Sequence, residues 1–265
     1  MKYKVGFIGC GNMASAIIGG LKKNADIAAG EIIVADALEA ALEKAKSELG
    51  VDTGDNKIVA AASDILFLSV KPQYYEEVIN EIKNVIPANQ VIITIAPGKT
   101  LKWLGERLGF DKKIIRTMPN TPALVGEGIT GVCKNENVTD EEFSYAMSLL
   151  SSFGMAEAIN ESLMDVCVSV SGSSPAYVFM FIEAMADAAV ADGMPRASAY
   201  KFAAQAVLGS AKMVLETGKH PGELKDMVCS PAGTTIEAVR VLEEKGFRSA
   251  VIEAMKACTK KAKGL

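Results

Sequence analysis

Small and hydroxyl residues crowd together near the end of the chain, in the segment Cys229–Val239, which reads CSPAGTTIEAV. The flanking sequence is rich in alanine and methionine and is typical of helix. Ser and Thr are preferred at helix starts, so one interpretation makes Thr234 or Thr235 the N-cap of a following helix. The other is a binding site, because free N–H groups and hydroxyls at a helix start can hold a carboxylate. The residue types alone favour both interpretations equally.

A second group of small residues lies near the other end, in Val5–Ala14, which reads VGFIGCGNMA. Gly9 and Gly11 permit a tight turn and a close approach of the backbone to a pyrophosphate. Ala14 fills the third position of this fingerprint, where a small residue lets a helix pack on a strand. Because the motif stands between an apolar run and a helix-like run, it predicts dinucleotide binding.

Asp36 follows the second apolar run, about twenty residues beyond the fingerprint, where a carboxylate bonds the adenosine ribose and repels a 2′-phosphate. The next residue is Ala37 rather than a phosphate-binding arginine. This pattern favours NADH at least as much as NADPH. A solvated turn aspartate is the alternative.

Three loops follow expected strands, where open α/β sheets bind their ligands. They are SVKPQ at Ser69–Gln73, IAPGKT at Ile95–Thr100 and RTMPNTPALVGEG at Arg116–Gly128. Lys71 could meet a phosphate or the nicotinamide, or be a solvated loop residue. The third loop is extended by its two prolines and offers Asn120 and Thr121 as hydrogen-bonding groups, or it is merely structural.

Proton-transfer groups are scarce. The single histidine, His220, stands between Lys219 and Pro221 and reads as a turn residue rather than a general base. No Ser-His-Asp set and no metal cluster is evident in the sequence. The chain therefore favours a hydride acceptor that needs little proton shuttling, such as a cyclic imine that is already partly protonated. The protein then has to bind and orient that substrate.

The elements that must position these residues follow an α/β pattern in the first part of the chain. Apolar runs separated by helix-like stretches predict βαβ units and a mostly parallel sheet, as in a Rossmann-type domain at residues 1–160. The expected strands are Tyr3–Ile8, Glu31–Asp36, Asp64–Val70, Gln90–Ile95 and Lys113–Met118, with weaker ones at Gly128–Cys133 and Met155–Ile159. The expected helices are Met13–Lys23, Ala37–Leu49, Tyr74–Val85, Leu101–Leu108 and Asp140–Ser152.

From about Glu161 the sequence predicts helices alone, and residues 161–265 form the second expected domain. Its helices are expected at Leu163–Ser169, Pro175–Asp192, Arg196–Thr217, Gly222–Val228, Thr235–Lys245 and Arg248–Lys261. Several are apolar around much of their circumference, more than so short a domain can bury. The pattern therefore predicts an intertwined or closely packed oligomer, with a self-contained helical bundle as the alternative.

Composition excludes several classes of protein. With 265 residues, 49% hydrophobic and a net charge of −4, the chain has enough apolar residues for a sizeable core and no general attraction to nucleic acid. The five widely spaced cysteines favour a reduced, cytoplasmic protein. The glycines near the N-terminus argue against a signal peptide. Ala176–Ala191 contains Glu183 and Asp187 and is too short to span a bilayer, so no membrane association is expected.

Five stretches together resemble the pyrroline-5-carboxylate reductase family over essentially the whole chain. The last of them is the most specific, because the glycine fingerprint is shared with many dehydrogenases. They are FIGCGNMASAII, FLSVKPQ, RTMPNTPALVGEG, SGSSPAYVF and HPGELKDMVCSPAGTTIEAVRVLEEKGFR. The resemblance implies reduction of 1-pyrroline-5-carboxylate to L-proline with NADPH or NADH. It also implies a homodimer through interleaved C-terminal helices, with the dimers assembled further into a decamer.

The resemblance also implies site residues. Thr235 is the expected catalytic residue, its hydroxyl reaching the ring nitrogen, while backbone N–H groups hold the substrate carboxylate. The substrate pocket would be lined by Glu161, Val228, Ser230, Gly233, Thr234 and Thr235. The cofactor would contact Gly9, Cys10, Gly11, Asn12, Met13, Asn56, Ser69, Val70, Lys71, Pro72, Ile95, Ala96 and Pro97, in addition to Asp36.

Departures from the family pattern leave alternatives open. Ala232 stands where the family has the first glycine of SPGGxT, and an arginine common after the second strand is absent. A β-hydroxyacid dehydrogenase is the nearest enzymatic rival, but no lysine occurs between Glu161 and Tyr200 to act as its catalytic base. Another imine reductase or a non-catalytic nucleotide sensor are the remaining alternatives.

Overall fold

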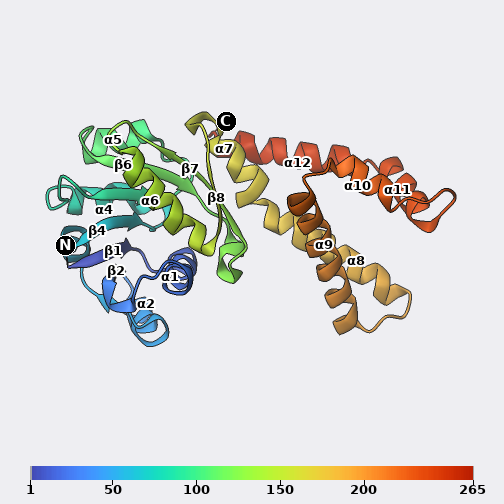
Figure 1. Ribbon diagram of the computed structural model, residues 1–265, viewed down its shortest axis with the longest axis horizontal. Coiled ribbons are helices and arrows are strands. Elements are labelled where there is room, and N and C mark those ends of the chain that lie inside the picture. Colours follow the sequence, from blue (N-terminus) through green and yellow to red (C-terminus); the bar gives the residue numbers. More distant parts are fainter. Residues whose placement is uncertain (1, 265) are drawn as a thin grey trace. The chain divides into compact units, whose positions relative to one another are not determined.

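The computed structural model describes residues 2–264 and divides into two compact units (Figure 1). The first runs to Ser173 and takes in the end of the chain from Thr259, and the second is Ser174–Cys258. The strands are β1 (Tyr3–Ile8), β2 (Ile32–Ala35), β3 (Asp52–Thr53), β4 (Ser63–Leu68), β5 (Val91–Thr94), β6 (Lys113–Met118), β7 (Gly128–Lys134) and β8 (Gly154–Ala158). The helices are α1 (Asn12–Asn24), α2 (Glu39–Lys44), α3 (Asn56–Ala62), α4 (Tyr75–Ile82), α5 (Leu101–Leu108), α6 (Asp140–Leu150), α7 (Met164–Cys167), α8 (Ser174–Ala191), α9 (Arg196–Thr217), α10 (Pro221–Met227), α11 (Thr234–Glu244) and α12 (Phe247–Ala262).

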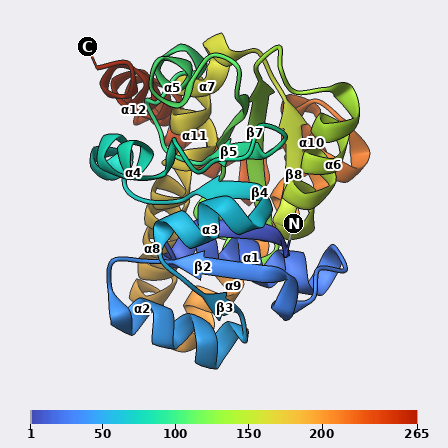
Figure 2. The same ribbon diagram turned by 90° about the vertical axis from the view of Figure 1, so that its left-hand side faces the viewer.

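The strands of the first unit form one sheet in the order β3-β2-β1-β4-β5-β6-β7-β8 (Figure 2). All neighbouring pairs are parallel except β6 and β7. The chain passes from β1 to β2 on one side and later returns to place β4 on the other side of β1. This reversal is the topological switch point at which open α/β sheets bind ligands.

Two apolar cores cover the two faces of this sheet. One joins α1 and α6 to the sheet and includes Phe7, Phe67, Ile17 and Leu149. The Phe7 and Phe67 rings stack with centroids 4.7 Å apart. The other core packs α3, α4 and α5 on the opposite face. Because both faces are covered, the central strands are apolar on both sides, which is why they read as continuous hydrophobic runs.

The expected Rossmann-type unit is confirmed, and so are the two weaker strands, which form β7 and β8. The sequence pattern did not reveal β3 and α3, which lie between Gly50 and Ser63. β3 has two residues, too few to show a period. A signal for α3 was present, because Asp55 is its N-cap and accepts a hydrogen bond from Ile58 N at 2.7 Å.

The second unit contains helices and no strand among its described residues, as expected. Its buried hydrophobic residues are only Ala186, Ala199 and Ala203, whereas Phe179, Met180, Phe202 and Leu215 are each more than 60% exposed. These side chains are too large and too many to be left in water by a finished fold. The unit therefore does not close a core by itself, which disfavours the self-contained bundle.

The compact units divide at Ser173/Ser174, whereas the domain boundary expected from the sequence is 160/161 and stays a prediction. The reason is a set of contacts that hold residues 161–173 to the sheet. Buried Arg116 of β6 pairs with Glu161 and with Asp165. Thr259 Oγ1 donates a hydrogen bond to Ser169 Oγ at 2.8 Å, which joins the end of the chain to the same unit.

One expectation about length was wrong. Glu161–Ala191 forms a helical stretch of 31 residues with mean hydropathy 1.3, which by length and composition alone could cross a membrane. Ala176–Ala191 looked too short because the preceding turns were assigned to a separate helix. The core helix of a soluble protein can meet the same criteria of length and composition, so this stretch by itself is weak evidence for a membrane span.

Candidate functional site

The glycine-rich turn after β1 lies against the turn after β4. Ser69 N donates to Ile8 O at 2.8 Å, and Ser69 Oγ donates to Gly9 O at 2.7 Å. On the other side, Gly9 N donates to Ala35 O at 2.8 Å. Hydrogen bonds to both sides therefore fix the turn at the switch point, and they do not require a ligand.

Gly9 and Gly11 serve different purposes within this turn. Gly9 has φ +95°, and a Cβ there would lie 2.7 Å from Ser69 carbonyl atoms, so only glycine fits. Gly11 has an ordinary φ of −77°, and a Cβ there would meet nothing within 4 Å. Since the fold does not require glycine at position 11, that position leaves open space for a ligand. A pyrophosphate fits this space as the fingerprint predicts.

Helix α1 presents an N-terminus suited to an anion. Its N-cap is Gly11, which offers no side-chain acceptor, and its first turn contains no acidic residue. Asn12 is exposed, Met13 is half-buried, and Ala14 is buried at 1% exposure against the sheet. The first N–H groups of α1 are thus left for a phosphate.

Asp36 is tied to the same turn. Its carboxylate accepts hydrogen bonds from Cys10 N at 2.7 Å and from Leu38 N at 2.9 Å. Both oxygens are engaged by backbone N–H groups, so Asp36 holds this turn, and its contact with a ribose stays a prediction. A carboxylate has about four acceptor positions, so two remain for ribose hydroxyls.

The other predicted cofactor residues lie at the same edge, beyond the carboxyl ends of β3, β4 and β5. Asn56 begins α3 and donates from Nδ2 to Glu81 Oε2 at 2.6 Å. Lys71 is exposed. The structure thus gathers them in one place, while their contacts with a cofactor stay a prediction. The remaining members are Val70 and Pro72 after β4 and Ile95, Ala96 and Pro97 after β5.

The Ser230–Thr235 segment, in the second unit, forms a tight turn that leads into α11. Gly233 N donates to Ser230 O at 3.1 Å, Pro231 occupies the second position, and Ala232 has φ +57°. This is the pattern of a type II turn, whose third residue is normally glycine. A Cβ on Gly233 would lie 2.3 Å from Ser230 Oγ, so a larger residue there would require the Ser230 side chain to move.

Replacing Ala232 by glycine is expected to stabilise the protein by about 1 kcal/mol, because alanine is strained in the left-handed region. The measurement is the free energy of unfolding in denaturant at one protein concentration. Gly246→Ala is the matched control, since Gly246 has φ +73° in open space of the same unit. This variant should lower the free energy of unfolding by a similar amount. An unchanged or lower stability of Ala232→Gly would contradict the strained turn.

The predicted N-cap was wrong. Gly233 is the N-cap of α11, so Thr234 and Thr235 are its first two helical residues. Both threonines are exposed, and neither hydroxyl has a hydrogen-bond partner among residues 2–264. The two hydroxyls and the first N–H groups of α11 are therefore available to a ligand. Val228, 59% exposed, lies nearby in the sequence after α10, beside an apolar hollow of about 310 Å³.

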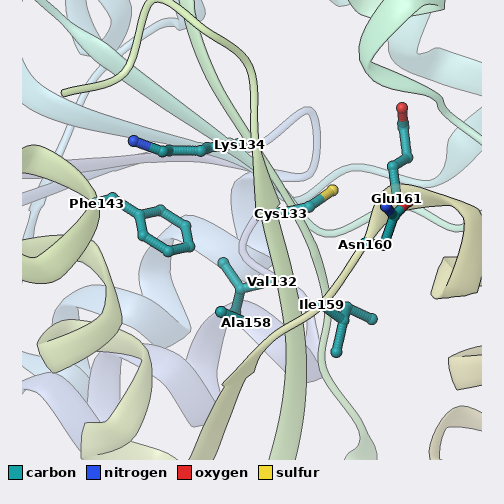
Figure 3. A pocket seen from close by; sticks show the side chains of 8 residues that line it. All are labelled: Val132, Cys133, Lys134, Phe143, Ala158, Ile159, Asn160 and Glu161. Atoms are coloured by element: carbon teal, nitrogen blue, oxygen red, sulfur yellow. The ribbon is translucent and has the colours of Figure 1, made fainter. Parts of the chain in front are cut away.

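Glu161 belongs to the first unit, whereas the other predicted substrate residues belong to the second. It lines a hollow of about 420 Å³ at the β7–β8 end of the sheet (Figure 3). There Cys133 points from β7 to the side on which Glu161 lies, whereas Lys134 points towards Phe143. The Glu161 carboxylate accepts hydrogen bonds from Arg116 and from Leu101 N. Sequence spacing gave no signal for these two partners.

His220 and the buried cysteines Cys10 and Cys133 do not have the surroundings of catalytic groups. His220 caps α10, its Nδ1 accepting from Gly222 N at 3.0 Å, so the turn-residue interpretation is confirmed. Burial raises the pKa of the Cys133 thiol to about 12. Burial, and to a smaller extent the negative charge of Asp36, also raises the pKa of the Cys10 thiol. These thiols are protonated and unreactive at neutral pH. No group of metal-ligating residues occurs within residues 2–264.

Comparisons with known proteins match two parts of the chain separately. A family model described as pyrroline-5-carboxylate reductase dimerisation matches residues 161–265, and one described as NADP oxidoreductase coenzyme F420-dependent matches residues 4–98. The pyrroline-5-carboxylate reductase of Escherichia coli (strain K12) is 55% identical, over 100% of this chain and 99% of its own length. That of Methanosarcina acetivorans is 44% identical, over 99% of this chain and 97% of its own.

A solved structure is similar to this chain over its full length. The crystal structure of Plasmodium falciparum pyrroline carboxylate reductase with NADP bound is 32% identical and superposes with a TM-score of 0.90. The match covers 100% of this chain and 98% of that one. Likeness over the full length of both chains extends to the helical unit as well as to the dinucleotide-binding fold.

Proposed function

The chain belongs to the pyrroline-5-carboxylate reductase family, and from that premise we propose that it reduces 1-pyrroline-5-carboxylate to L-proline with NAD(P)H. The observation that carries this proposal for the present chain is the free start of α11. Thr234 and Thr235 offer hydroxyls and N–H groups that the protein itself does not use. A substrate carboxylate can be held there by the same groups that begin the helix.

The chemistry asks little of the protein beyond binding. A bound NAD(P)H would supply a hydride to the carbon of the C=N bond, and the protonated ring nitrogen would become the secondary amine. The residues at Gly233–Thr235 bind the carboxylate, and the Thr235 hydroxyl hydrogen-bonds the ring nitrogen. Because the ring nitrogen already carries its proton, no general acid is needed, in keeping with the capping role of His220.

A steady-state assay tests this function. Purified protein is expected to consume NADPH or NADH only when 1-pyrroline-5-carboxylate is added, with stoichiometric formation of proline. Consumption of neither cofactor would overturn the reductase function and favour the nucleotide sensor. Turnover of a β-hydroxyacid in the reverse direction would favour the dehydrogenase alternative instead.

Asp36→Ser is expected to raise kcat/KM with NADPH relative to NADH by roughly ten- to a hundredfold, because a like charge beside the 2′-phosphate is removed. No cation follows Asp36 before Lys44, and Glu39 adds another carboxylate in the first turn of α2. The wild-type ratio is measured under the same conditions. An unchanged ratio would mean that Asp36 serves only to hold the turn at Cys10.

The helical unit supports a homodimer. Its apolar side chains are exposed in the single chain, and the dimerisation model of the family covers the same residues. A second copy would cover this surface, including the apolar stretch Glu161–Ala191. We propose further assembly into a decamer of five dimers, which light scattering would distinguish from a dimer. The free cysteines support a cytoplasmic location, and the net charge of −4 supports the absence of a nucleic-acid partner.

A further inference from the structure

The first turn of α5 is held by a carboxylate from a distant part of the chain. Glu161 Oε1 accepts from Leu101 N at 2.7 Å and from Arg116 Nη1 at 3.0 Å. Leu101 is the first residue of α5, and 60 positions separate it from Glu161. The Thr100 hydroxyl accepts from Trp103 N at 3.0 Å, so the start of α5 is capped by two different groups.

The ion pair between Glu161 and Arg116 differs from a surface ion pair because its guanidinium is buried. The Arg116 side chain is 5% exposed, and its partners Glu161 and Asp165 are 33% and 30% exposed. A buried guanidinium that loses a partner retains an uncompensated charge, so the surrounding structure must adjust. Glu161 makes the closer contact, because Arg116 Nη2 lies 3.5 Å from Asp165 Oδ1.

The capped helix start determines the path of a cofactor loop. β5 ends at Thr94 within the sheet, and the loop Ile95–Lys99 is all that joins it to Thr100. Its first residue is held too, Ile95 N donating to Leu68 O at 3.4 Å. This short connection between two fixed ends has little freedom. We therefore expect a shift of the α5 start to move Ala96 and Pro97 more than Ile95, which is held to Leu68.

We propose that Glu161 is a positioning residue for NAD(P)H, which sets the Ile95–Lys99 loop through Leu101 N and buried Arg116. This inference rests on the proposed function of that loop in binding the cofactor. It is an alternative to the expected contact of Glu161 with the substrate, which stays a prediction. The Oε1 oxygen of Glu161 accepts from both donors of its own unit, and the experiment below distinguishes the two roles.

Direct binding of cofactor provides the test. Trp103 is the single tryptophan and lies in the first turn of α5, with Lys99 Nζ 4.1 Å from its ring centroid. Energy transfer from this indole to reduced nicotinamide measures the Kd of NADPH and NADH without turnover. Wild-type protein that binds neither cofactor would count against the proposed function, whatever the variants do.

Glu161→Ala is expected to raise the Kd and KM of the cofactor by roughly tenfold, as loss of a charge-assisted hydrogen bond suggests. The substrate KM, measured at saturating cofactor, should stay within about twofold, because a positioning residue makes no substrate contact. Glu161→Gln should recover most of the affinity, since its amide oxygen can accept from both donors. Asp165→Asn is the matched control on the same guanidinium and should leave the cofactor Kd unchanged.

Other outcomes would overturn the proposal. A raised substrate KM with an unchanged cofactor Kd in Glu161→Ala would mean direct substrate contact. If neither the substrate KM nor the cofactor Kd changed, the ion pair of Glu161 with Arg116 would have no role in binding. If the alanine variant does not fold, Glu161→Gln decides. A glutamine variant with a wild-type melting temperature and a strongly raised cofactor Kd would contradict rescue through the two hydrogen bonds.

Discussion

Replacing Thr235 by valine is expected to lower kcat/KM for the cyclic imine substrate by roughly ten- to a thousandfold, because one hydrogen bond to a charged group is lost. Valine has nearly the same volume and keeps the backbone N–H. The hydroxyl has no partner among the described residues and Gly233 is the N-cap, so the helix itself should lose little. The kinetic constants and the melting temperature are measured together.

Thr139→Val is the matched control for this prediction. Thr139 is a true N-cap, whose hydroxyl accepts from Glu142 N at 3.2 Å while Glu142 Oε2 accepts from Thr139 N at 3.0 Å. Its replacement should cost about 1 kcal/mol of stability and leave kcat/KM unchanged. Thr235→Val should instead lower kcat/KM and leave the stability nearly unchanged. A Thr235→Val protein with lowered stability and normal activity would reduce Thr235 to a structural residue.

Gly11→Ala is expected to raise the Kd of NAD(P)H by at least roughly a hundredfold while the melting temperature stays close to that of the wild type. A Cβ at this position meets no protein atom within 4 Å, so the apo fold accepts it. The added methyl group would occupy the space through which the backbone approaches the pyrophosphate. Energy transfer from Trp103 and thermal unfolding are the two measurements.

Gly9→Ala should behave differently, because its Cβ would lie 2.7 Å from the Ser69 carbonyl and 2.8 Å from Val70 N. Its φ of +95° is also strained for alanine. Stability and cofactor affinity should therefore fall together. If Gly11→Ala bound cofactor normally, the turn would not be the pyrophosphate site. If Gly9→Ala were as stable as Gly11→Ala, that result would contradict the close contact between Gly9 and the turn after β4.

Local signals were sufficient for most of the first unit. The apolar runs that form β1, β4, β5 and β6 are long enough to be recognised as strands buried on both faces of a sheet. Glycines or prolines mark their ends. The turn motif around Gly9 was recognisable because its reason is local: close backbone packing needs glycine at fixed spacing. β3 was missed because two residues carry no period, and its pairing with β2 alone defines it.

The start of α11 shows where local reasoning stops. Threonine, glycine and serine are all favoured near a helix start, so residue types did not decide which of them is the N-cap. The turn at Ser230–Gly233 decided it, because the hydrogen bond from Gly233 N and the left-handed Ala232 place the first helical residue at Thr234. That placement leaves the two threonine hydroxyls unused.

The sequence by itself determined the βαβ order, the glycine turn, the carboxylate after β2 and an apolar helical half that needs a partner, because each follows from neighbouring residues. Only the tertiary structure decided the partners of Glu161. Leu101, Arg116 and Glu161 lie on α5, β6 and the turn before α7, and only the folding of that unit brings them together. A carboxylate finds its donors in space, and sequence spacing holds no record of contacts made across 45 and 60 positions.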